Sequence, residues 1–259
     1  MTEIYVICED SIYKYAEDYI LSFKPIYTGI ILYKINGINM PIINPEYIYI
    51  FVQTIPDSYI NNINIYLLNI EQLSRPFYLD YIVNMSKRVK TIDYSRANML
   101  YYDCNKFLPY QVNYAEVYNY PKTRDICILA YSPCSTRRAN IVNEFRDRRQ
   151  EIDVITGWKK ERDEKLFTYK ILINIGHSDE YRIFESIRCD RCIHNQMIVI
   201  SEKKQNEELY HLKDYMIFEP YESIIDKAIY VLRNYEAYFA ILNLGKMPIS
   251  SVSIPNLNE

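Results

Sequence analysis

Glycine is scarce in this 259-residue sequence, and the scarcity excludes several classes of nucleotide-binding protein. Only five glycines are present. A P-loop, a G-x-G-x-x-G turn and a collagen repeat each need glycine at fixed spacing, and none of these patterns occurs. The H-E-x-x-H and G-x-S-x-G motifs of two hydrolase classes are missing too. A bound phosphate would therefore rest on helix N-termini and arginine side chains.

Long apolar runs and a basic leader are also missing. No stretch reaches the roughly 18 apolar residues that span a bilayer, and the first residues, Met1-Thr2-Glu3, are acidic rather than basic. The six cysteines are scattered, as is usual in a reducing compartment. We therefore expect no transmembrane segment and a cytoplasmic location, which would be the host cytoplasm for a viral protein.

Positive charge is not in excess. The chain has 30 Lys and Arg against 33 Asp and Glu, a net charge of −3, so we expect no nucleic-acid partner. Hydrophobic residues make up 49% of the chain, which excludes disorder over most of its length. Tyrosine is abundant, with 28 residues. Tyr, Ile and Asn have AT-rich codons, which fits an AT-rich bacterium or a large DNA virus.

Short apolar runs alternate with amphipathic segments throughout the second half. The pattern predicts strands at 125–131, 152–155, 170–175, 197–200 and 215–218, and helices at 137–149, 180–191, 223–235 and 236–244. Buried strands that alternate with helices are typical of right-handed βαβ units on a parallel sheet. Ligands of such sheets bind outside the carboxyl ends of the strands, which here are followed by loops 131–137, 156–163, 175–182 and 201–207.

The first half shows the same alternation less clearly. The pattern predicts strands at 4–8, 27–33, 47–52, 63–68 and 89–92, and helices at 12–20, 77–87 and 95–101. Residues 109–124 contain two prolines and read as a linker. We expect an α/β protein with an N-terminal Rossmann-like domain at 1–115, a C-terminal one at 116–245, and a tail at 246–259 that forms a strap or a frayed end.

One polar cluster follows the expected strand at 170–175. His177 and Ser178 begin a loop into the expected helix, whose free N–H groups would form an anion site capped by Ser178 or Asp179. Glu185 falls one to two turns into that helix, where a carboxylate could accept bonds from a ribose diol, and Glu202 ends the next strand. The alternative is a capped helix with a solvated face and a hydrogen-bonded loop histidine.

A second cluster lies at the first strand-to-helix turn of the second half. Ser135 is a helix start signal, and Arg137 and Arg138 follow it in the first helical turn. Cations at a helix N-terminus oppose the helix dipole, so a bound diphosphate would explain the pair. The alternative is a solvated basic helix start.

In the first half, Glu71 and Asp93 each follow an expected buried strand. Both therefore belong to the carboxyl edge of the first sheet, and both lie just before a potential N-cap, Ser74 or Ser95, which is the alternative explanation of these polar segments. Cys189-x-x-Cys192 with His194 resembles part of a metal site, but no second cysteine pair completes four ligands. We expect buried, inert thiols and no bound metal.

Beyond these separate signals, residues 120–245 resemble the donor-binding domain of GT-B glycosyltransferases. Many retaining members carry Glu-x7-Glu before a strand, and here His177 and Glu185 have that separation, with His in the first position. The segments 183–188 and 198–202 resemble the family's sequence motifs in this region. The segments 68–73 and 93–98, with Arg137-Arg138, resemble a bacterial and viral glycosyltransferase-like group.

The resemblance implies two Rossmann-like domains that face each other across a cleft. It also implies transfer of a sugar from a nucleotide-diphosphate donor to a glycan, protein or small-molecule acceptor, without a metal or another cofactor. Arg137, Arg138, Ser135, Ser178, Glu185 and Glu202 would bind the donor, with Glu185 on the ribose. His177 would contact the transferred sugar or a phosphate, and Glu71 or Asp93 would serve as general base in an inverting reaction.

The same resemblance leaves an alternative, a catalytically degenerate GT-B-like module that binds a nucleotide or carbohydrate as a partner subunit. His177 in place of a carboxylate favours it. A homodimer is a further possibility.

Overall fold

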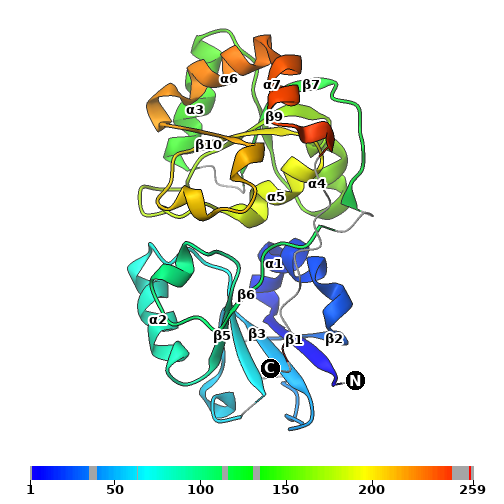
Figure 1. Ribbon diagram of the computed structural model, residues 1–259, viewed down its shortest axis with the longest axis vertical. Helices are drawn as coiled ribbons and strands as arrows, with labels where there is room; N and C mark the ends of the chain where they lie inside the picture. The colour runs from blue at the N-terminus through cyan, green and yellow to red at the C-terminus, as the bar shows by residue number, and fades with distance from the viewer. Residues whose placement is uncertain are drawn as a thin grey trace. The chain divides into compact units, whose positions relative to one another are not determined.

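The computed structural model describes residues 2–34, 40–62, 64–112, 116–130, 135–246 and 257 (Figure 1). Contacts divide the chain into two compact units. Unit 1 comprises Met1–Gln111 together with Ser251–Glu259, and unit 2 comprises Val112–Ser250. Residues 131–134 of an expected site loop and most of the expected tail lie outside the described residues.

Unit 1 is a parallel sheet of six strands with the order β2-β1-β3-β4-β5-β6. Its elements are β1 (Ile4–Glu9), α1 (Asp10–Ser22), β2 (Gly29–Tyr33), β3 (Ile48–Val52), β4 (Ile65–Asn69), α2 (Pro76–Ser86), β5 (Lys90–Asp93) and β6 (Lys106–Phe107). Strands β3 and β4 are buried along their whole length, as expected of central strands covered on both faces.

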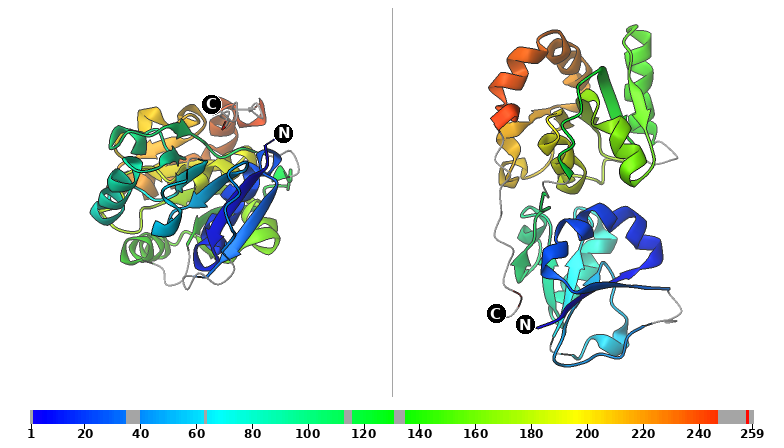
Figure 2. Two further views of the ribbon diagram at one scale, coloured as in Figure 1. Left: turned by 90° about the horizontal axis from the view of Figure 1, so that it is seen from below. Right: turned by 90° about the vertical axis from the view of Figure 1, so that its right-hand side faces the viewer.

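Unit 2 is a parallel sheet of five strands with the order β11-β10-β9-β7-β8. Its elements are β7 (Arg124–Leu129), α3 (Thr136–Asp147), β8 (Asp153–Ile155), α4 (Lys159–Leu166), β9 (Tyr169–Asn174), α5 (Ser186–His194), β10 (Ile198–Glu202), β11 (Ile217–Glu219), α6 (Ile224–Arg233) and α7 (Tyr235–Ile241). Helices α3 and α6 lie on one face of this sheet and α4 and α5 on the other (Figures 1 and 2).

The two units share one topology. In each, the first strand lies between the second and the third, and the later strands follow outward from the third. The chain therefore reverses its direction of travel across the sheet beside the first strand, at β1/β3 in unit 1 and at β7/β9 in unit 2. This reversal is the switch point at which open α/β sheets bind ligands. The predicted α/β fold with two parallel sheets is confirmed.

Two predicted helices and one predicted loop need correction. The segment 95–101 forms only a 3-10 turn at Asn98–Leu100, because the Asn98 side chain bonds to Asp93 at the end of β5 and to the backbone of Glu71 and Leu73. The helix expected at 180–191 begins only at Ser186; before it, Ile183 bridges to Gln205 in parallel fashion. Within the expected loop 156–163, helix α4 begins at Lys159.

Helix α4 was not predicted from the sequence because its buried face carries charged residues. Arg162 and Asp163 are both buried, and Asp163 accepts hydrogen bonds from Arg162 and from Arg191 of α5. Charged residues in buried positions give no apolar periodicity. Among the described helices, none combines the length and apolar character needed to cross a membrane.

Candidate functional site

The carboxyl edge of the unit 2 sheet gathers polar side chains from four segments. These are the start of α3 and the residues that follow β9, β10 and β11. Because β7 and β9 border the switch point, the start of α3 and the loop after β9 lie on its two sides. This is the edge at which the sequence pattern predicts the site.

Arg137 lies at the centre of this edge. Its guanidinium forms ion pairs with Asp179 and Glu202 and lies over the Tyr221 ring, 4.3 Å from the ring centroid. The Tyr221 hydroxyl donates a hydrogen bond of 2.9 Å to the Arg137 carbonyl oxygen. Residues from α3, the β9 loop, the end of β10 and the segment after β11 thus converge on one arginine.

Glu202 joins Arg137 to a second cation. Its Oε1 accepts from Arg137, and its Oε2 accepts from the Gly176 backbone N–H at 3.1 Å and from Lys204 Nζ at 2.9 Å. The Lys204 side chain is only 7% exposed. Glu202 therefore holds two cationic groups in fixed positions at the end of the sheet.

Gly176 makes this arrangement possible. A Cβ atom at this position would lie 2.6 Å from Lys204 Nζ, closer than real Cβ contacts come. The absence of a side chain lets the lysine ammonium approach the backbone, while the Gly176 N–H reaches Glu202. Any larger residue would displace Lys204 from its place beside the carboxylate.

Arg138 has a different environment from Arg137. It is buried, and its Nε donates a hydrogen bond of 2.9 Å to the carbonyl of Ile175, just after β9. Its backbone N–H donates to Ser135 Oγ at 3.4 Å, which confirms Ser135 as the N-cap of α3. Arg138 and Ser135 thus fix the start of α3 to the end of β9 across the switch point.

Glu185 belongs to a second network at this edge. It is the N-cap of α5 and forms no capping bond with its side chain, so neither Ser178 nor Asp179 caps that helix as expected. Its carboxylate lies 3.0 Å from Arg188, whose guanidinium donates to the Asn174 side chain at 3.4 Å. The Asn174 amide in turn donates to Ser201 Oγ at 3.0 Å.

His177 and Ser178 occupy the surface of the loop after β9. The His177 side chain is exposed, and its ring centroid lies 5.6 Å from that of Tyr181. Ser178 is half-buried, and its carbonyl accepts from the Tyr181 N–H at 3.2 Å. Both residues lie at the same sheet edge as Arg137, because all of them follow carboxyl ends of parallel strands.

The chemistry of the unit 2 edge suits an anion. Around Arg137, three cationic side chains, Arg137, Arg138 and Lys204, stand against two carboxylates, Asp179 and Glu202, while Glu185 is paired with Arg188. Arg137 Nε is buried and has no hydrogen-bond partner within the described ranges. In that part of the chain, no three His, Cys, Asp or Glu side chains come close enough together to hold a metal ion.

The carboxyl edge of unit 1 is organised around Asp93. Its carboxylate is completely buried and accepts hydrogen bonds from the Asn69 and Asn98 amides, the Ser95 N–H and the Tyr102 hydroxyl, at 2.7 to 3.0 Å. Burial raises the pKa of Asp93 to about 7, while these hydrogen bonds act to lower it. Asp93 therefore lies beneath the surface and orders the loops that follow β4 and β5.

Glu71 lies on the loop that Asp93 orders. Its backbone carbonyl accepts from the Asn69 and Asn98 amides, both at 2.9 Å, and both of these amides also donate to Asp93. The Glu71 carboxylate is half-buried and lies 3.2 Å from Arg75. The structure thus brings Glu71 and Asp93 together through shared amides, with Glu71 nearer to solvent.

Four residues of the unit 2 edge were not predicted from the sequence: Gly176 as a contact for Lys204, Lys204 itself, Tyr221 and Arg188. The loop 201–207 contained Lys204, so its position after a strand was an available signal. Tyr221 gave no signal, because its contact with Arg137 depends on the path of the segment after β11. Arg188 gave none, because its contact with Glu185 depends on where α5 begins. Cys189 and Cys192 are buried free thiols, as predicted.

Comparison with known proteins finds relatives in Acanthamoeba polyphaga mimivirus. Protein L140 is 34% identical over 248 residues, which cover 89% of this chain and 80% of L140. Proteins L138 and L137 are 28% and 30% identical, and the matches cover 88% and 90% of this chain but only 29% and 34% of theirs. The chain thus spans about a third of these two longer relatives. No protein-family model matches.

Solved structures share the fold at low sequence identity. An α1,3-fucosyltransferase with GDP-fucose aligns with a TM-score of 0.52 and 12% identity, covering 93% of this chain and 82% of that one. HepE of Anabaena in complex with UDP-glucose aligns with a TM-score of 0.53 and 8% identity, covering 93% of both chains. The two parallel sheets therefore have the fold of GT-B glycosyltransferases.

Proposed function

The chain belongs to the family of mimivirus protein L140, and we propose that it is a glycosyltransferase that uses a nucleotide-diphosphate sugar as donor. Two fold neighbours were solved with nucleotide sugars, GDP-fucose and UDP-glucose. A shared fold alone does not determine chemistry. The proposal therefore depends on the site, and above all on Arg137 at the switch point of unit 2.

Arg137 is suited to exchange its surface carboxylate for a diphosphate. Asp179 is 86% exposed, and ion pairs of exposed carboxylates contribute little to stability. A diphosphate offers more oxygens and more charge, and arginine binds phosphates through two parallel hydrogen bonds. Glu202 and Tyr221 would keep the guanidinium in place while Asp179 is displaced.

The other cations of this edge support the same role. The Lys204 ammonium, held by Glu202, supplies a second positive charge, and Ser135 and Arg138 position the N-terminus of α3. Negative charge accumulates on the diphosphate as the bond to the sugar breaks, so cations fixed in advance lower the barrier. Because side chains supply this charge, we propose that transfer needs no metal.

The remaining site residues are assigned by their places at the two edges. We assign Glu185 to the ribose hydroxyls of the donor, and Ser178 and His177 to the sugar and its phosphate. In an inverting reaction, Glu71 would accept the proton of the acceptor hydroxyl. Asp93 would act as a positioning residue, because it is buried beneath the Glu71 loop.

Calorimetric titration of the full chain with UDP-, GDP- and dTDP-sugars tests this proposal. We expect one nucleotide class to bind, and Arg137→Ala to weaken its affinity about 30- to 150-fold, since charged hydrogen bonds contribute about 2–3 kcal/mol. Arg146→Ala, an exposed arginine near the end of the same helix, is the matched control and should bind normally.

Two results would change the assignment. If no nucleotide sugar binds to the wild-type chain, the proposal is wrong. If a nucleotide sugar binds but is neither transferred nor hydrolysed with any acceptor tried, the degenerate binding module is the correct description.

A further inference from the structure

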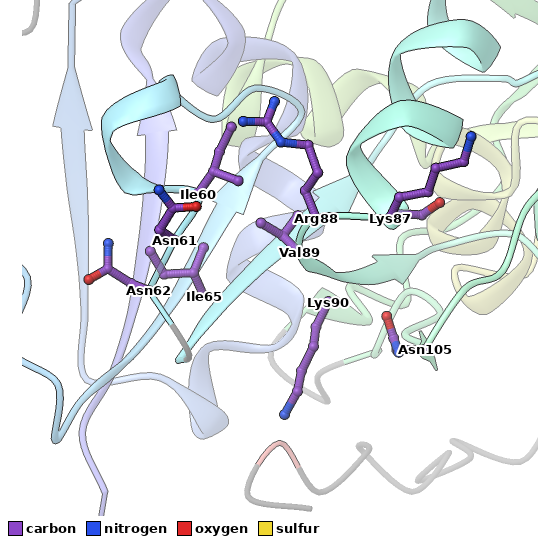
Figure 3. A pocket seen from close by; sticks show the side chains of 10 residues that line it. Ile60, Asn61, Asn62, Ile65, Lys87, Arg88, Val89, Lys90 and Asn105 are labelled. Atoms are coloured by element: carbon purple, nitrogen blue, oxygen red, sulfur yellow. The ribbon is translucent and has the colours of Figure 1, made fainter.

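A pocket of about 420 Å³ opens at the amino edge of the unit 1 sheet (Figure 3). It is formed where α2 ends and where β4, β5 and β6 begin, whereas Glu71 and Asp93 lie at the carboxyl ends of β4 and β5. Its lining consists of Ile60, Asn61, Asn62, Ile65, Ser86, Lys87, Arg88, Val89, Lys90 and Asn105. The pocket therefore lies at the edge opposite the one that the sequence argument selected, and its volume is typical of small-molecule sites.

The charged residues that line this pocket are all cationic. Lys87, Arg88 and Lys90 follow one another closely between α2 and β5, and none of the ten lining residues is acidic. Arg88 lies 3.6 Å from Asp57, but the Asp57 side chain is 91% exposed, so this pair is weak. Within the described ranges, no hydrogen bond or ion pair is made by the Lys87 side chain.

Lys90 is held in position by an aromatic residue rather than by an acid. Its ammonium lies 5.4 Å from the centroid of the Tyr66 ring and 3.4 Å from the Tyr66 hydroxyl. A cation over a ring keeps its full charge. The pocket therefore combines three positive charges with no carboxylate in its lining to neutralise them.

Neutral hydrogen-bonding groups complete the lining. Asn105 uses its side-chain oxygen to accept from the Thr91 N–H at 2.7 Å, which leaves its NH2 group as the donor. Asn62 does the opposite: its NH2 group donates to the Tyr59 carbonyl at 2.9 Å, and its oxygen is left as an acceptor. Ile60 and Ile65 are buried and close the base of the pocket beneath these groups.

We propose that this pocket binds an anionic saccharide, that is, a sugar unit that carries a carboxylate, sulfate or phosphate group. The charged ends of the three cations point in different directions (Figure 3), so one of them would pair with the anionic group. The asparagine donors and acceptors would bond to hydroxyl groups of the sugar. An inorganic ion would use only the first of these two features. The proposal does not depend on donor binding in unit 2.

Titration calorimetry on the full chain tests this site with named probes. These are trigalacturonate, glucose 6-phosphate, a sulfated disaccharide, inorganic phosphate, inorganic sulfate and maltotriose. We expect at least one anionic sugar to bind, with inorganic ions at least tenfold weaker and maltotriose undetectable. The identity of the best probe distinguishes carboxylate, phosphate and sulfate as the anionic group.

Charge reversal locates the site. Lys87→Glu/Lys90→Glu should weaken binding of the anionic sugar at least tenfold, about 1.4 kcal/mol. The matched control is Lys14→Glu/Lys24→Glu, which makes the same change of charge at two exposed positions of unit 1 and should bind normally. Arg137→Ala should also bind the anionic sugar normally, whatever becomes of nucleotide binding.

Three outcomes would overturn the proposal. The first is that no anionic sugar binds, in which case Lys87 and Arg88 serve only the C-terminus of α2. The second is that inorganic phosphate or sulfate binds as tightly as every sugar. The third is an equal loss of binding in the Lys14/Lys24 control, which would mean a general charge effect.

Discussion

The two units have the same strand order but use the carboxyl edges of their sheets differently. In unit 2 that edge carries charged side chains around Arg137, and Glu202 holds two cations in place. In unit 1 the same edge is tied together by one buried carboxylate, Asp93, with amide and hydroxyl donors around it. Strand order therefore decides where a site can form. The side chains at that edge decide whether it is suited to bind a ligand or to hold its loops together.

A second contrast concerns the completely buried carboxylates of the two units. Asp93 accepts from four donors, whereas Asp190 of α5 accepts from the Tyr210 hydroxyl, and its Oδ2 has no hydrogen-bond partner within the described chain. The nearest imidazole nitrogen, His211 Nε2, is 4.0 Å from that oxygen. Burial raises the pKa of Asp190 to about 8. The Asp93 carboxylate is thus part of a hydrogen-bond network, whereas the surroundings of Asp190 favour its protonated carboxyl group.

Removing the network of unit 1 should have the largest effect. Asp93→Ala leaves the donors of Asn69, Asn98 and Tyr102 buried without their acceptor, so we expect a loss of about 3–5 kcal/mol in the free energy of unfolding. Denaturant unfolding followed by circular dichroism measures it. Asp80→Ala, an exposed position on α2, should cost less than about 0.5 kcal/mol.

If Asp93→Ala does not fold, Asp93→Asn gives the answer, because it preserves shape while one amide group faces the donors. It should destabilise less than alanine does. A loss below about 1 kcal/mol for both variants would show that Asp93 does not hold the edge together.

Both buried carboxylates, with pKa values of about 7 for Asp93 and about 8 for Asp190, should lower stability as pH rises, and a variant of Asp190 separates its contribution. A folded-state pKa near 8 for Asp190, against 3.8 ordinarily, means that the folded chain binds the proton more tightly. Its stabilising contribution is complete at low pH and is lost as pH rises through about 8. Burial and His211 lower the pKa of His194 to about 4, which gives the opposite slope between about pH 4 and 6.5.

Asp190 can therefore be measured between about pH 6.5 and 8. Over this range we expect the wild type to lose about 2 kcal/mol of unfolding free energy from Asp190, at about 1.4 kcal/mol per pH unit. Asp190→Asn cannot titrate and should lack that loss in urea unfolding at each pH. Equal slopes for variant and wild type would mean that Asp190 is already ionised when buried.

The smallest expected effect sharpens the role of Lys204. Gly176→Ala places a Cβ 2.6 Å from the lysine ammonium, the far end of a flexible side chain, so Lys204 should move and the fold should persist. We expect nucleotide-sugar affinity to fall about tenfold, or 1.4 kcal/mol, with little change in melting temperature.

The control for this variant is Gly29→Ala, where the added Cβ meets Tyr5 at an ordinary 3.6 Å. Lys204→Ala combined with Gly176→Ala should bind no worse than Lys204→Ala alone. Additive losses from the two changes would show that Gly176 acts independently of the lysine.

Sequence patterns predicted the sheets well because their strands are continuous apolar runs. Strands β9 and β10 begin and end within two residues of their predicted bounds. Helix α4 was missed because Arg162 and Asp163 occupy its buried face. The turn at Asn98–Leu100 was mistaken for a helix because hydrogen bonds between the Asn98 side chain and the backbone of Glu71 and Leu73, more than 20 residues away in the sequence, help to set its shape.

Only those features of the site that follow from the sheet topology could be predicted from the sequence. The rule on strand ends correctly brought Arg137 and Glu202 to one edge, although they are 65 residues apart. It could not show that the Arg138 side chain donates a hydrogen bond to the Ile175 carbonyl, or that Asp93 is buried. Those facts depend on side-chain rotamers and loop paths, which no spacing in the sequence encodes.

The position of a bound nucleotide tests the difference between the two edges most directly. A crystal structure of the chain soaked with UDP and with GDP should show the diphosphate within hydrogen-bonding distance of the Arg137 guanidinium, with Asp179 displaced and Glu202 still in place. A nucleotide bound at the carboxyl edge of unit 1, or away from Arg137, would contradict the account.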